Sequence, residues 1–132
     1  MDLKKLTPKS DTIIVELKHP STGEILDNED GSVMTISRYA PHSKEYKAAV
    51  NKETDKKLKV AQAKKKFMLT AEELEKTGIK LLAETTFDWN ITYGGKQPDF
   101  SIELAEDIYT EVFWIREQLE EAESDYLDFT KV

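Results

Sequence analysis

The segment 12–18, near the start of the chain, is rich in β-branched residues and has apolar residues at every second position from 13 to 17. A period of two residues is typical of a strand with one buried face. Two polar turns that contain glycine follow, and the segment 32–38 is again rich in β-branched residues. We therefore expect residues 12–38 to form a small antiparallel β unit. The apolar face of its first strand carries Ile13, Val15 and Leu17.

The rest of the chain has the spacing of three and four residues that is typical of helices. Ser43 is suited to cap the first helix, whose exposed faces are rich in lysine and whose apolar stripe is thin. Thr70, followed three residues later by Glu73, has the pattern of a capping box. It predicts a second helix that ends near Thr85.

The last predicted helix covers residues 102–125 and follows Ser101, a candidate N-cap. Carboxylates dominate its polar side, and its apolar positions recur at intervals of three and four residues, which makes it amphipathic. These apolar positions are Leu104, Ile108, Val112, Ile115, Leu119, Ala122 and Tyr126.

These patterns predict an α+β fold. A small N-terminal antiparallel β unit is followed by three helices, and the last helix is long, amphipathic and acidic. The length of 132 residues fits one domain over residues 1–132, with its helical part at 43–125. We expect the ends, 1–10 and 127–132, to be flexible.

The charges are distributed unevenly. Residues 44–80 contain eleven basic and six acidic side chains, whereas residues 81–132 contain three basic and thirteen acidic ones. The net charge of −7 disfavours nucleic acid as the main ligand. The lysines between 56 and 66 remain an alternative contact for nucleic acid, beside the simpler interpretation of a solvated helix face.

Composition also bears on the compartment and on catalysis. The chain has no cysteine, no apolar run long enough for a membrane span and no apolar core of a signal peptide at its start, so we expect an intracellular protein. His19 and His42 both lie in turns, without a partner at catalytic or ligand spacing. We expect no catalytic residue, no metal site and no cofactor, although the carboxylates between Glu103 and Asp128 leave a cation site as the alternative to a solvated surface.

Trp114 is the most informative single residue. Its neighbours one helical turn away are polar, which is typical of an aromatic side chain that a partner covers. The alternative is that Trp114 packs beneath the β unit. Tyr109 and Phe113 widen the apolar stripe of the same helix, so the candidate partner-binding residues are Tyr109, Phe113 and Trp114.

The order of several short motifs resembles the small tail assembly chaperones of long-tailed bacteriophages and prophages, over most of the chain and most strongly over 79–129. The motifs are His19-Pro20-Ser21-Thr22-Gly23-Glu24, Ser43-Lys44-Glu45-Tyr46-Lys47, Leu81-Leu82-Ala83-Glu84, Trp89-Asn90, Pro98-Asp99-Phe100-Ser101, Ile108-Tyr109 and Ile115-Arg116-Glu117-Gln118.

The resemblance implies a protein that is not an enzyme and needs no cofactor. It would bind the helical tape measure protein in the host bacterial cytoplasm, keep it soluble during tail morphogenesis and be absent from the finished virion. The tail tube protein is a second candidate partner, and a homo-oligomer stays open. Two competing hypotheses are a structural protein of the virion, at the tail or the head–tail junction, and a small regulator that contacts nucleic acid.

Overall fold

The computed structural model describes residues 2–3, 10–64 and 70–127, with the side chains of 60–64 left out. The flexible ends predicted for 1–10 and 127–132 lie mostly outside this part. The described residues form a three-stranded antiparallel sheet and four helices, so the predicted α+β class is confirmed. In this part of the chain, no helix combines the length and the apolar character that crossing a membrane requires.

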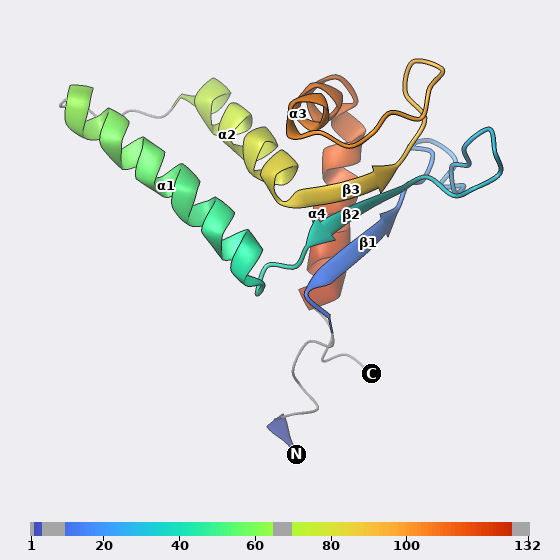
Figure 1. The fold of residues 1–132 in the computed structure, drawn as a ribbon, viewed down its shortest axis with the longest axis horizontal. Coiled ribbons are helices and arrows are strands. Elements are labelled where there is room, and N and C mark those ends of the chain that lie inside the picture. Colours follow the sequence, from blue (N-terminus) through green and yellow to red (C-terminus); the bar gives the residue numbers. More distant parts are fainter. Residues whose placement is uncertain (1, 4–9, 65–69, 128–132) are drawn as a thin grey trace.

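The sheet has the strand order β1-β2-β3, with β2 in the centre (Figure 1). β1 (Thr12–Glu16) pairs with β2 (Thr35–Tyr39), as expected for the predicted β unit. The third strand, β3 (Thr86–Asn90), comes from a segment where we expected no strand. It pairs with β2, and the register shifts between Ser37 and Arg38. The edge strands of the sheet are therefore β1 and β3.

Three of the four helices among the described residues begin where the sequence predicts, and the last one has no predicted start. They are α1 (Lys44–Lys64), α2 (Ala71–Glu84), α3 (Ile102–Glu111) and α4 (Phe113–Leu127). Each of the hydroxyls of Ser43, Thr70 and Ser101 accepts a hydrogen bond at 3.1 Å from a backbone N–H three residues later. The three predicted N-caps are thus confirmed, because a cap depends only on a few neighbouring residues.

The prediction of a single helix over 102–125 is wrong. Val112 has φ −100° and ψ 68°, outside the helical region, and separates α3 from α4. Its N–H still bonds the carbonyl of Ile108 at 2.7 Å, and its carbonyl accepts from the N–H of Ile115 at 3.0 Å. The break lets α3 pack against α2 while α4 packs against β1. One straight helix could not make both contacts, so tertiary packing overrides the local periodicity.

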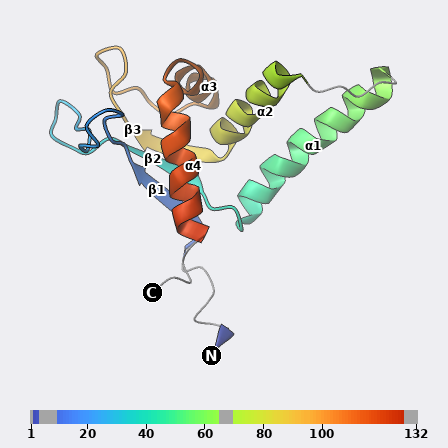
Figure 2. The same ribbon diagram turned by 180° about the vertical axis from the view of Figure 1, so that it is seen from behind.

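One face of the sheet is covered. Helix α4 crosses this face, and α1 and α2 form an antiparallel pair that diverges from the sheet (Figures 1 and 2). Trp89 of β3 is 7% exposed and donates from Nε1 to the Pro98 carbonyl at 2.9 Å, as expected for a core residue. The centre of the core is formed by Val15, Leu17, Ile36, Ile91, Ala105, Ile108 and Leu119.

A charged side chain lies inside this core. Arg38 of β2 is 1% exposed, and its guanidinium lies 3.1 Å from the Glu123 carboxylate of α4. It also donates to the Thr85 hydroxyl at 2.7 Å. The Tyr46 hydroxyl of α1 donates to the other oxygen of Glu123 at 3.2 Å. A single carboxylate therefore connects the sheet, α1 and α4.

Removing this carboxylate should destabilise the protein strongly. Glu123→Ala leaves the Arg38 charge buried without its partner, and we expect the free energy of unfolding to fall by about 3 kcal/mol. This is the low end for a buried pair because Glu123 keeps 22% of its side chain exposed. Urea unfolding measures the change.

Two further variants make that test specific. The double variant Arg38→Met/Glu123→Leu removes both charges, so it should recover about 2 kcal/mol of the loss. The matched control Glu120→Ala, an exposed residue of α4, should change stability by no more than about 0.5 kcal/mol. A loss for Glu123→Ala as small as that of the control would contradict the assigned role.

Candidate functional site

The three candidate partner-binding residues do not share a surface. Tyr109 is 0% exposed, and its hydroxyl lies 2.8 Å from the Thr86 hydroxyl of β3. It is a core residue in this structure. Phe113 is 62% exposed at the first position of α4. Trp114 is half-buried and packs against the core.

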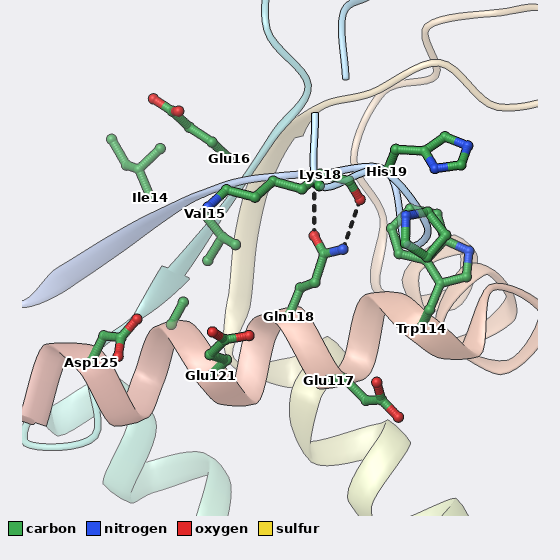
Figure 3. A pocket seen from close by; sticks show the side chains of 13 residues that line it. Ile14, Val15, Glu16, Lys18, His19, Trp114, Glu117, Gln118, Glu121 and Asp125 are labelled. Atoms are coloured by element: carbon green, nitrogen blue, oxygen red, sulfur yellow. Dashed lines mark hydrogen bonds between the residues drawn. The ribbon is translucent and has the colours of Figure 1, made fainter. Parts of the chain in front are cut away.

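Trp114 packs against the core beneath the β unit. This is the alternative to an exposed partner contact that the sequence left open. It lines a hollow of about 540 Å³ between β1 and α4, and Figure 3 shows it beside the turn that follows β1. We call this the edge hollow. Its lining residues are Ile14, Val15, Glu16, Lys18, His19, Pro20, Gly23, Trp114, Glu117, Gln118, Glu121, Ala122 and Asp125.

A side-chain amide joins α4 to the backbone that follows β1 within the edge hollow. The carbonyl oxygen of Gln118 accepts from the backbone N–H of Lys18 at 2.9 Å, and its amide nitrogen donates to the Lys18 carbonyl at 2.7 Å. Both bonds are drawn in Figure 3. Gln118 thus satisfies both backbone groups of one residue, as a neighbouring strand would.

The edge hollow is acidic. Its lining includes the carboxylates of Glu16, Glu117, Glu121 and Asp125, against the single ammonium group of Lys18. The His19 side chain stabilises its own turn, because its Nδ1 accepts hydrogen bonds from the backbone N–H groups of Ser21 and Thr22 at 3.1 and 3.3 Å. The hollow therefore has a negative potential at neutral pH, which favours a cationic ligand.

A second hollow, of about 350 Å³, lies between α1, α2 and α4. We call it the three-helix hollow. Gly78 and Leu81 of α2 are on its lining, and a Cβ built at Gly78 would meet no atom within 4 Å, so the helix surface is open there. The complete lining is Arg38, Tyr46, Gly78, Leu81, Leu82, Glu120, Glu123, Ser124 and Leu127.

Apolar surface continues beyond the three-helix hollow. Leu74 lies one turn before Gly78 on the same side of α2 and is 52% exposed. Leu127, the last residue of α4, is 53% exposed at the other wall. Within the hollow, burial is the main cause that raises the pKa of the Tyr46 phenol, and the Glu123 carboxylate adds to it. The leucines of the hollow thus share its lining with the Arg38–Glu123 pair and with Tyr46, Glu120 and Ser124.

Helix α1 is held to α2 mainly by charges. Lys80 of α2 lies 3.7 Å from Glu53 of α1, and Lys52 of α1 lies 3.7 Å from Glu84 of α2. Burial, and then the neighbouring Glu53, raises the pKa of Glu84. Among the described side chains of α1, Ala49 is the only buried apolar one. Few apolar contacts place α1 at the less stable end of the molecule.

The three remaining candidates for chemistry are the residue His42, a metal site and a nucleic-acid contact. The ring of His42 lies 2.8 Å from the Asp11 carboxylate and stacks on Tyr126. No cluster of three or more histidine, aspartate or glutamate side chains suited to a metal ion occurs within the described residues. The lysine segment 56–66 lies only partly within them, so nucleic-acid contact there stays a prediction.

Comparison of the chain with protein-family models, with curated proteins and with solved structures gave no match. The resemblance to tail assembly chaperones therefore stays a prediction. The two hollows beside α4 are the observations on which a function can be built.

The burial of Tyr109 predicts a loss of stability at alkaline pH. Burial raises the pKa of its phenol from about 10 to about 12, so the unfolded chain ionises first. The contribution is complete below pH 10 and is lost as the pH rises through about 12, with an upper limit of about 3 kcal/mol. Tyr109→Phe should therefore show a smaller decrease between pH 9 and 12 in urea unfolding. An equal decrease in both proteins would assign the alkaline sensitivity to other groups.

Proposed function

We propose that this protein is a non-catalytic binding protein that shelters an apolar helical segment of another polypeptide. The observation that carries the proposal is the three-helix hollow, which lies open between α1, α2 and α4 and has leucines on two of its walls. An amphipathic helix binds by placing its apolar face in such a groove. A volume of about 350 Å³ suits the side chains along one face of a helix.

The exposed leucines extend this apolar surface along the axis of α2, so that it can contact several turns of a helical client. Leu74 and Leu81 lie seven residues apart on one side of α2, with Gly78 between them. Because these positions are one and two helical turns apart, they form a straight apolar strip along the helix. Gly78 leaves room for a client side chain to approach the backbone of α2.

The attachment of α1 suits a hollow that must accept different side chains. Its contacts with α2 rest on the ion pairs of Glu53 and Glu84. The lysines of these pairs are at least partly exposed, but the carboxylates of Glu84 and Glu53 are only 9% and 11% exposed, so the pairs hold α1 beside α2. The adaptable feature of this wall is its small number of apolar contacts, since Ala49 is the only buried apolar residue among the described side chains of α1. The chain's net charge of −7 would help to keep a complex with an apolar client in solution.

The resemblance to tail assembly chaperones supports a more specific proposal. The client would be the tape measure protein of a long-tailed phage, bound in the cytoplasm of the host bacterium before the tail tube assembles. The tail tube protein is a second candidate partner. A structural role in the virion is the competing proposal, and it requires this protein in purified particles at a fixed ratio to the other components.

Substitutions at Gly78 test the hollow as the client site. Gly78→Trp fills it, and Gly78→Ala changes the same position with little added volume. Both replace glycine inside a helix with a better helix former, with a gain of about 1 kcal/mol for alanine and a smaller one for tryptophan, so both should fold. We expect Gly78→Trp to lose about tenfold or more in affinity for the client, whereas Gly78→Ala binds as the unchanged protein does.

The measurement is co-expression with the tape measure protein of the same phage genome. The unchanged protein and Gly78→Ala should keep this client in the soluble fraction and co-purify with it, and Gly78→Trp should not. Equal solubilisation by all three would show that the hollow is not the client site. Failure of the unchanged protein to solubilise the client, together with its presence in purified virions, would favour the structural role.

A further inference from the structure

The outer edge of β1 exposes backbone groups that point away from the sheet. The N–H of Leu17 donates to Met34 at 2.9 Å, and the carbonyl of Asp11 accepts from Ala40 at 2.8 Å, both toward the β2 side. In an antiparallel pair this direction alternates along the strand. The backbone groups of Ile14 and Glu16 therefore point outward, as those of Lys18 do.

Gln118 shows what such groups bind. Its amide occupies the N–H and the carbonyl of Lys18 at 2.9 and 2.7 Å and so replaces a strand at that residue. Among the described residues, no comparable group reaches the outward backbone of Ile14 or Glu16. These two residues leave two donors and two acceptors open at the wall of the edge hollow.

Natural edge strands are usually protected by a charged side chain, a proline, a bulge or a covering segment. Here the middle residue of β1 is Ile14, whose side chain is 67% exposed. An apolar side chain beside open backbone groups is typical of an edge that receives another strand. The edge hollow of about 540 Å³ gives the incoming side chains room between β1 and α4.

The charge of the hollow selects the occupant. Glu16 stands on the strand itself, and Glu117, Glu121 and Asp125 stand on α4. The Glu16 side chain points to the face of β1 opposite α4, as that of Ile14 does (Figure 3). An extended peptide that paired with β1 would therefore meet Glu117, Glu121 and Asp125 with the alternate side chains that face α4. Lysine or arginine at those positions would be attracted, whereas acidic residues would be repelled.

We propose that the edge of β1 is a second binding site, which takes an extended peptide with alternating basic and apolar residues by strand addition at Ile14 and Glu16. This goes beyond the proposed function, because a helical client has its backbone groups already paired and cannot use an open strand edge. The two sites lie on different sides of α4 and can be tested separately.

The probe is an acetylated and amidated peptide with the sequence Lys-Val-Lys-Thr-Lys-Val. We expect it to bind the full chain at low salt and to shift the amide NMR signals of Ile14 and Glu16, with slower hydrogen exchange at both. Two control peptides are Glu-Val-Glu-Thr-Glu-Val and a form of the probe with methyl groups on alternate backbone nitrogens. Both controls should bind about tenfold more weakly or worse, because one reverses the charge and the other blocks the backbone bonds.

Two variants of the protein complete the test. Ile14→Pro removes only an outward N–H, which an edge strand tolerates, and should weaken the probe about tenfold, whereas Ile14→Val should not. Glu121→Lys/Asp125→Lys should weaken it to a similar degree. Signal shifts confined to Gly78 and Leu81, equal binding of the methylated peptide, or no binding of the probe would each overturn the proposal.

A second copy of the chain is the other possible occupant. Sedimentation of the protein without peptide distinguishes the two occupants. If the edge takes a peptide, the unchanged protein and Ile14→Pro should have the same mass in solution. A dimer that dissociates in Ile14→Pro would assign the edge to self-association and would overturn the peptide site. Binding of a helical client at the three-helix hollow would be unaffected by either result.

Discussion

The contact between the Arg38 guanidinium and the Glu123 carboxylate determines where α4 lies on the sheet. A buried arginine is costly unless its charge is compensated, and Glu123 on α4 supplies the compensating charge at 3.1 Å. The helix must therefore cross the sheet at the level of Arg38, the fourth residue of the central strand. Because Tyr46 bonds the same carboxylate, the start of α1 is fixed as well. Both hollows depend on this placement of α4.

Helix α4 presents three faces, and each has a different neighbour. Ile115 and Leu119 are buried against the sheet. Glu117, Glu121 and Asp125, spaced by four residues, line the edge hollow, whereas Glu120, Ser124 and Leu127 line the three-helix hollow. Spacings of three and four residues keep each set on one side of a helix. Five of the thirteen acidic residues in the segment 81–132 thus lie on the walls of the two surface hollows.

Local signals in the sequence predicted the local structure. β1, β2 and the three N-caps follow from residues within one turn or one strand, and they are confirmed. The break at Val112 has no such signal, because the spacing of apolar residues continues through it unchanged. Val112 is still half-buried, and only the different directions of α2 and the sheet separate α3 from α4. The strand at 86–90 escaped the prediction for a similar reason, since its partner β2 lies about fifty residues earlier.

That missed strand decides which surface is open. With β3 paired to one side of β2, β1 is left at the edge beside α4, and no pattern within residues 12–16 reveals this. Trp114 illustrates the same limit: its polar neighbours indicated an exposed partner contact, but the turn after β1 covers part of it and makes it a wall of the edge hollow. The type of most elements could be predicted from the sequence, with β3 as the exception, whereas the two surfaces could not, because each is formed by segments that are distant in the chain. A strand edge recognises an extended backbone and an apolar groove recognises a helix, so the two surfaces select partners of different conformation.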